Sequence, residues 1–182
     1  AVSKARVAVP LIYMGYTNMA MRRGFGRFAR DAQASGASGV ILSDMTPDEA
    51  TEWRSAARSA ELDTIFLVAP TSTDERIRLA AEASTGFIYC VSRTGVTGAG
   101  TVVPPEVVAT VGRIRSLTDL PVCVGFGIST KEHVEMVCKV ADGAVVGSYL
   151  VDMLHRVWGF PKGRDEIVNA IRALKEGTLQ SQ

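Results

Sequence analysis

Two stretches decide the fold class: Pro121-Val-Cys-Val-Gly-Phe-Gly-Ile-Ser129 and Ala141-Asp-Gly-Ala-Val-Val-Gly-Ser148. In each, a short run of mostly β-branched apolar residues ends in a glycine-bearing turn. A third run of this kind, Gly86-Phe-Ile-Tyr-Cys-Val91, precedes glycines at positions 95, 98 and 100. Continuous apolar runs of this length are typical of strands buried on both faces, as in parallel sheets. The three stretches therefore predict parallel strands with glycine-rich turns at their ends.

The same pattern recurs upstream, so that six βα units follow one another. The predicted strands are residues 7–16, 39–44, 64–69, 86–91, 121–127 and 143–148. Amphipathic stretches predict helices over residues 25–35, 47–60, 73–84, 105–117, 131–140 and 165–175. Thr46, with Pro47 and Glu49 behind it, and Thr73, with two acidic residues behind it, are the expected helix caps. Alternating βα units form either an open doubly wound sheet or a closed barrel.

The position of the glycines favours the barrel. An open Rossmann sheet usually carries its glycine-rich turn after the first strand, and residues 17–21 contain no glycine there. Phosphate sites of (β/α)8 barrels commonly follow the last strands, where the glycines of this chain gather. Six strands and 182 residues fall short of the eight strands and roughly 250 residues of a usual barrel. We therefore expect an α/β fold of the (β/α)8 TIM-barrel type, truncated to its last six βα units, with residues 1–182 as one incomplete domain. A genuine six-stranded sheet is the alternative.

Composition narrows the class of protein. There are 20 Lys and Arg against 19 Asp and Glu, and 47% of the residues are apolar, which excludes a disordered, collagenous or coiled-coil chain. The near-zero charge argues against a nucleic-acid partner, and no apolar run is long enough to span a membrane. An opening stretch broken by Pro10 is a poor signal peptide. Cys90, Cys123 and Cys138 lack metal-ligand spacing, which indicates reduced thiols in a cytoplasmic protein.

Three glycine-bearing turns after successive strands predict a phosphate site, because glycine lets backbone N–H groups approach an anion closely. Gly147 and Ser148 would add N–H groups and a hydroxyl. The alternative is that each glycine only relieves a tight turn. Residues 95–101 read as a lid over the site or as a plain connector.

Other candidate residues stay open to more than one interpretation. Asp44, at the end of a predicted strand, could contact substrate, meet a partner chain or satisfy loop amides ahead of Thr46. Tyr16 and Tyr89 could flank a planar ligand or belong to the core. His133 and His155 fall on helical stretches without a nucleophile at a catalytic spacing, and no metal-binding, Walker or nucleophile-elbow motif is present.

At these residues the chain resembles the tryptophan synthase alpha subunit family. The resemblance covers nearly the whole chain, in order along Met14-Gly-Tyr-Thr-Asn18, Gly39-Val-Ile-Leu-Ser-Asp-Met-Thr-Pro-Asp-Glu49, Phe66-Leu-Val-Ala-Pro-Thr71, residues 86–98, residues 120–129 and residues 141–148. It implies a (β/α)8 barrel lyase that cleaves indole-3-glycerol phosphate to indole and glyceraldehyde 3-phosphate without a cofactor of its own. It also implies a partner, the beta subunit, which makes tryptophan with pyridoxal phosphate.

The resemblance assigns roles to residues. It implies phosphate-binding turns at Gly98, Gly127, Gly147 and Ser148. It implies a wall of the indole-glycerol pocket at Tyr16, Tyr89 and Phe126. Its closing loop matches residues 93–97, which include Arg93, Gly95 and the Thr97 hydroxyl that helps to position catalytic groups. Asp44 matches an aspartate in a loop on the face where the alpha and beta subunits meet.

The resemblance fails at the catalytic carboxylates. The family's glutamate at the end of its second strand and the aspartate of the next loop have no counterpart in this sequence, so no catalytic residue is identifiable. The retro-aldol reaction needs such an acid and base. One hypothesis is therefore a lyase whose first two βα units lie elsewhere, and the other is a non-catalytic phosphate-binding barrel module that binds a partner chain. A different phosphate-binding barrel enzyme is a distant third. A six-stranded portion also leaves two strand edges open, so we expect pairing with a second copy or with the missing fragment.

Overall fold

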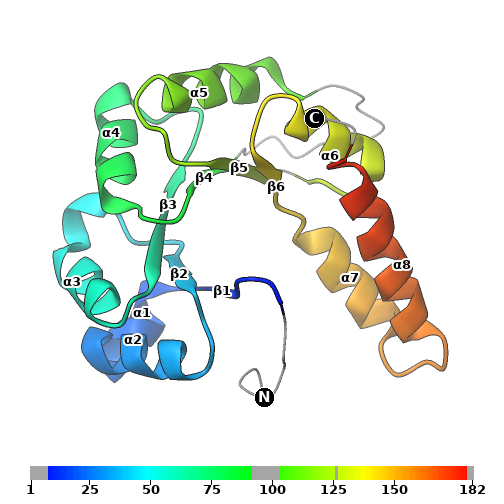
Figure 1. Cartoon of the computed structure of the whole chain (residues 1–182), viewed down its shortest axis with the longest axis horizontal. Coiled ribbons are helices and arrows are strands. Elements are labelled where there is room, and N and C mark those ends of the chain that lie inside the picture. Colours follow the sequence, from blue (N-terminus) through cyan, green and yellow to red (C-terminus); the bar gives the residue numbers. More distant parts are fainter. Residues whose placement is uncertain (1–7, 92–102, 126, 180–182) are drawn as a thin grey trace. The chain divides into compact units, whose positions relative to one another are not determined.

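The computed structural model describes residues 8–91, 103–125 and 127–179, which fall into two compact units (Figure 1). The first unit contains residues 8–68, 72–88 and 117–120, and the second contains residues 69–71, 89–91, 103–116, 121–125 and 127–179. Each unit has strands and helices of its own.

The first unit is built on three parallel strands. Its elements are β1 (Ile12–Gly15), α1 (Thr17–Arg23), α2 (Phe25–Ala34), β2 (Gly39–Leu42), the 3-10 turn η2 (Pro47–Glu49), α3 (Thr51–Ser59), β3 (Asp63–Val68) and α4 (Asp74–Ala83). β1 pairs with β2 and β2 pairs with β3, both in parallel. Trp53 is buried in the core. The centroid of its ring lies 6.0 Å from that of Phe25 and 5.9 Å from that of Phe28. The aromatic cluster thus joins α3 to α2 over the sheet.

The second unit carries the remaining strands. Its elements are β4 (Ile88–Val91, of which Ile88 belongs to the first unit), α5 (Pro105–Arg115), β5 (Val122–Gly125), α6 (Lys131–Cys138), β6 (Gly143–Ala144), α7 (Ser148–Val157) and α8 (Gly163–Glu176). β4 neighbours β5, and β5 pairs with β6 in parallel, with Cys123 opposite Gly143. Buried side chains of the strands and of α5 and α6 form the core, among them Cys90, Val107, Ile114, Val122, Val124 and Val137.

The six predicted strands are all present in the predicted order, but they are shorter than expected. The first covers residues 12–15 rather than 7–16, and the last covers residues 143–144 rather than 143–148. Two helices begin where no helix start was predicted: α1 directly after Tyr16, and α7, which contains the expected helical stretch around His155, at Ser148. Both predicted strand ends are therefore turns into helices. No helix in the described ranges is long and apolar enough to cross a membrane.

The two predicted caps differ in outcome. The Thr73 hydroxyl accepts a hydrogen bond from the Arg76 N–H at 3.3 Å, which confirms the cap of α4. Thr46 makes no such bond to the backbone. Its hydroxyl instead donates to the Glu49 carboxylate at 3.1 Å, and the chain forms a 3-10 turn before α3 starts at Thr51. The prediction of one continuous helix over residues 47–60 is therefore wrong at its first turn.

Candidate functional site

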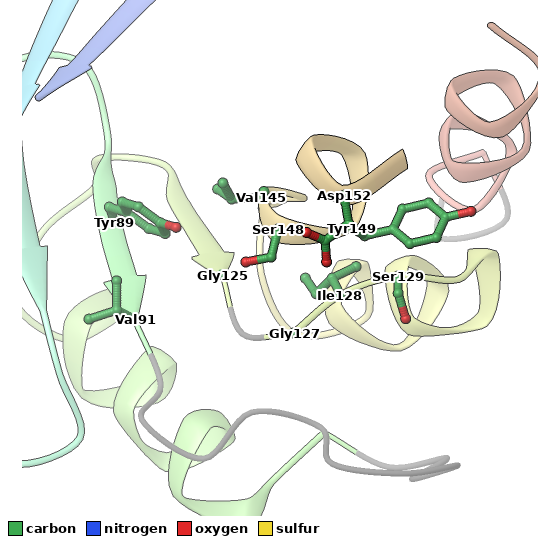
Figure 2. A pocket seen from close by; sticks show the side chains of 11 residues that line it. Tyr89, Val91, Gly125, Gly127, Ile128, Ser129, Val145, Ser148, Tyr149 and Asp152 are labelled. Carbon is green, nitrogen blue, oxygen red and sulfur yellow. The ribbon is translucent and has the colours of Figure 1, made fainter. Parts of the chain in front are cut away.

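A cleft of about 500 Å³ lies in the second unit, at the ends of β4, β5 and β6 (Figure 2). Its lining residues come from these strands, from the turn before α6 and from the first turns of α7; they are Tyr89, Val91, Gly125, Gly127, Ile128, Ser129, Val145, Gly147, Ser148, Tyr149 and Asp152. Four of them were predicted: Tyr89, Gly127, Gly147 and Ser148. The structure therefore brings the glycine turns after β5 and β6 into one cavity.

The N-terminus of α7 gives this cleft its anion-binding character. Gly147 is the N-cap, and its carbonyl accepts hydrogen bonds from the N–H groups of Leu150 at 3.0 Å and Val151 at 3.2 Å. The N–H groups of Ser148 and Tyr149 precede the first bond of the helix and have no intrahelical acceptor. The first turn contains no acidic residue, and the N-cap makes no side-chain bond. Free N–H groups and the helix dipole together favour a bound anion.

Ser148 adds a hydroxyl at the same terminus. Figure 2 shows its side chain pointing from α7 into the cleft, toward Gly125. Ser148 and Gly147 are both exposed, so a ligand can reach them. A hydroxyl beside free N–H groups is a combination that suits phosphate oxygens.

On the opposite wall, the turn after β5 shows why glycine is required there. Gly127 has a φ of 47°, a left-handed conformation that side chains other than glycine rarely adopt. The following Ser129 N–H donates to the Nδ1 atom of His133 at 3.4 Å, and Thr130 caps α6 by accepting from the His133 N–H at 3.3 Å. His133 thus has a structural role at the start of α6, where it holds the Ser129 turn that lines the cleft.

Tyr89 forms the wall on β4. Its side chain is half-buried, and in Figure 2 its hydroxyl points toward the cleft between Val145 and Gly125. Burial, and to a smaller degree the neighbouring Cys123, raises the pKa of the phenol above its usual value of 10. Tyr89 therefore presents a neutral hydroxyl near neutral pH, able to donate or accept a hydrogen bond.

Several lining residues were not predicted from the sequence, and among them Asp152 carries a carboxylate. It lies four residues after Ser148 on α7, so helical spacing puts both side chains on one face. That signal was hidden because residues 143–148 read as a strand. Tyr149 also lines the cleft, but its ring points away from Ser148 in Figure 2.

Asp44 lies in the first unit and has a local partner. One carboxylate oxygen, Oδ1, accepts from the Thr17 N–H at 2.7 Å and from the Thr17 hydroxyl at 2.8 Å. These bonds, the backbone one foremost, lower the pKa of Asp44 below its usual value. Asp44 thus accepts from the amide that opens α1 and not from a loop amide ahead of Thr46, while contacts with substrate or with a partner chain stay predictions.

The other predicted residues belong to the first unit or lie outside the described part of the chain. Tyr16 is exposed and lines an apolar cleft of about 290 Å³ in the first unit, together with Ile12, Met14, Met19 and Phe28. Five predicted residues lie outside the described part of the chain: Arg93, Gly95, Thr97, Gly98 and Phe126. The described residues contain no group of three or more His, Cys, Asp or Glu side chains placed to hold a metal ion.

Comparison with known proteins identifies the family. The family model described as "Tryptophan synthase alpha chain" matches residues 1–179. The chain belongs to the tryptophan synthase alpha chain family. Among curated members of this family, the tryptophan synthase alpha chain of Geobacter sulfurreducens is 44% identical over 173 residues, which are 95% of this chain and 65% of that protein. The alpha chain of Dehalococcoides mccartyi is 44% identical over 154 residues, which are 85% of this chain and 60% of that protein.

Solved tryptophan synthase structures share the fold. The tryptophan synthase α2β2 complex of Pyrococcus furiosus contains a chain that matches with a TM-score of 0.86 and 32% identity, covering 94% of this chain and 68% of that one. Tryptophan synthase of Mycobacterium tuberculosis matches with a TM-score of 0.81 and 40% identity, covering 93% and 62%. These matches confirm the α/β fold of the TIM-barrel type. The chain spans less than two thirds of the length of the curated tryptophan synthase alpha chains named above.

Proposed function

We propose that this chain binds indole-3-glycerol phosphate and takes part in its cleavage to indole and glyceraldehyde 3-phosphate, a step of tryptophan biosynthesis. Membership of the tryptophan synthase alpha chain family supports this activity. The observation that carries it is the cleft at the N-terminus of α7, where uncapped N–H groups, Ser148 and the Gly127 turn surround one cavity.

In this proposal the phosphate sits against α7. The N–H groups of Ser148 and Tyr149 and the Ser148 hydroxyl donate to its oxygens, while Gly127 and Gly147 leave room for close approach. Tyr89, whose hydroxyl faces the cleft, lies on the side where the rest of the substrate extends. Phe126, Gly98 and Thr97 keep the roles that the resemblance implies for them.

Cleavage breaks the bond between indole C3 and the adjoining glycerol carbon. An acid must protonate C3 and a base must take the proton of the hydroxyl on that carbon, so that its C–O bond becomes the aldehyde and the electron pair of the broken bond returns to the ring. The only carboxylate among the described lining residues is Asp152, beside the phosphate subsite. The acid and base therefore belong to the glutamate and aspartate that the resemblance implies and that these 182 residues do not contain.

Titration with indole-3-glycerol phosphate tests the proposal. We expect saturable binding to the purified protein, and a loss of more than about tenfold in affinity for Gly147→Asp, because a carboxylate would occupy the phosphate position. Gly112→Asp is the matched control: both glycines have open space around their Cα atoms, and Gly112 lies on α5 away from the cleft lining. Equal binding by Gly147→Asp and the parent protein, or no binding by either, would overturn the proposal.

Indole release, followed with the same substrate, separates the enzyme from the non-catalytic binding module. Because the acid and base each contribute roughly 10²–10⁴-fold, we expect the chain alone to release indole at below about one thousandth of an ordinary enzyme rate. The low count of carboxylates in the cleft favours the binding module for the chain in isolation. Turnover of about 1–10³ s⁻¹ would contradict the expectation that the chain alone is slow because it lacks the catalytic carboxylates.

The proposed partner is the tryptophan synthase beta subunit, as in the solved Pyrococcus furiosus complex. Asp44 is exposed, and its Oδ1 atom accepts hydrogen bonds from Thr17. Its Oδ2 atom is therefore left to accept from a donor on the partner. We expect Asp44→Ala to weaken capture of a beta subunit severalfold. Asp31→Ala, which also removes an exposed carboxylate with a hydrogen-bonded partner, is the control. A cytoplasmic location belongs to the same proposal, supported by three free cysteines.

A further inference from the structure

Asp152 brings a negative charge to a cleft that is otherwise suited to an anion. It lines the cavity together with Gly147 and Ser148. In Figure 2 its carboxylate and the Ser148 hydroxyl extend from the same side of α7, above Ile128. Four residues of helix rise by about 6 Å, so the carboxylate lies roughly one turn from the N–H groups that would hold a phosphate.

Within the described residues, Asp152 is not neutralised by an ion pair. It is exposed, and none of the salt bridges or hydrogen bonds in the second unit involves it. Arg156 lies one turn further along α7 but makes no bond to it. The described cleft lining contains no lysine or arginine. Among the described residues, N–H and hydroxyl dipoles are therefore the groups that would hold a bound anion, with one full negative charge close by.

We propose that Asp152 is a specificity-determining residue, which weakens the binding of doubly charged headgroups more than that of singly charged ones without preventing either from binding. The inference rests on the proposed function, since it concerns the headgroup of the same ligand. The repulsion is proportional to the ligand charge. A phosphate monoester with two charges therefore loses twice as much binding free energy to Asp152 as a phosphodiester with one.

The probes are glycerol 3-phosphate and its methyl diester, which share a carbon skeleton and differ by one charge. Binding of each is measured by calorimetry at pH 8, where the monoester is doubly charged. For Asp152→Asn we expect the monoester to bind about tenfold more tightly and the diester about threefold more tightly. Asp165→Asn is the matched control, since Asp165 is an exposed aspartate in the first turn of α8 and not a cleft residue; it should change neither affinity by more than twofold.

Ionic strength supplies a readout that a purely structural role would not move. The gain of Asp152→Asn for the monoester should shrink severalfold between about 0.02 M and 0.5 M salt, because mobile ions screen an exposed charge. An equal gain for both esters, a gain independent of salt, or weaker monoester binding by Asp152→Asn overturns the inference. If neither ester binds to any of the three proteins, the proposed phosphate site fails and the inference fails with it. Binding that is unaffected by Asp152→Asn overturns only the inference.

Discussion

At the residue scale, the contact between Tyr89 and Gly125 shows how one missing side chain shapes the cleft. A Cβ atom at Gly125 would lie 2.7 Å from Cε2 of the Tyr89 ring and closer still to its hydroxyl. Such distances are below van der Waals contact, so the tyrosine occupies the space that a side chain on β5 would need. Glycine is required at position 125 to leave space for the Tyr89 ring. Backbone conformation does not require it, since Gly125 is not in the left-handed region.

Gly125→Ala should therefore displace the Tyr89 ring and destabilise the protein by about 1–3 kcal/mol, the usual cost of overpacking. Chemical denaturation measures the loss. In a Tyr89→Ala background the same substitution should cost less than about 0.5 kcal/mol, since the obstructing ring is gone; this coupling is the decisive quantity. Gly112→Ala, on a helix with open space around it, should be neutral or stabilising. Additive effects of the Gly125 and Tyr89 substitutions would contradict the proposed packing.

At the element scale, sequence patterns located elements better than they located their ends. Residues 39–44 and 64–69 were predicted as strands, and β2 and β3 lie there. Continuous runs of β-branched residues seldom form anything other than buried strands. The last predicted strand failed at its end: Val145 and Val146 extend the apolar run, yet the helix begins at Ser148. Local apolarity does not show where strand pairing stops, and that misplaced boundary concealed Asp152. Cleft residues that precede a helix could be predicted from glycines, whereas those on its second turn depended on the helix being recognised.

Asp142 joins three elements of the second unit and gives a prediction at this scale. Its Oδ2 atom accepts from the Val122 N–H at 2.8 Å at the start of β5, and its Oδ1 atom accepts from Arg115 at 3.1 Å at the end of α5. Asp142 itself directly precedes β6. Partial burial alone would raise the pKa of the carboxyl, but these two donors outweigh burial and hold the pKa below its usual value. Asp142→Asn should cost about 1 kcal/mol in the free energy of unfolding.

The pH dependence of that loss has a definite sign. Because the folded pKa is lowered, the unfolded chain binds the proton first, and the contribution of Asp142 is complete above the unfolded pKa of about 4. It is lost as the pH falls through the lower folded value. Urea titrations should thus show the difference between Asp142→Asn and the parent protein at pH 6, and its disappearance toward pH 2.5. Asp119→Asn, at an exposed loop residue, serves as control. A difference that persists at low pH would assign the effect to packing instead.

At the scale of the whole molecule, the β1 edge of the first unit gives a prediction about association at high concentration. β1 is the terminal strand of the described sheet order and pairs only with β2. Apolar side chains around it are exposed, with Met14 at 58% and Tyr16 at 62%. An open strand edge beside uncovered apolar surface favours pairing with another chain. Of the two pairings that the sequence predicts, with a second copy or with the missing fragment, we expect the pairing with a second copy to use this edge.

Light scattering across a dilution series tests that inference. The parent protein should shift from monomer to dimer or larger species as the concentration rises to tens of micromolar, and Met14→Lys should shift the midpoint upward by about tenfold, because a charge on an edge strand opposes pairing. Val108→Lys places the same charge on an exposed apolar position of α5 and should leave the midpoint unchanged. A compact, stable monomer at every concentration, or an equal effect of both lysines, would show that the β1 edge does not direct association.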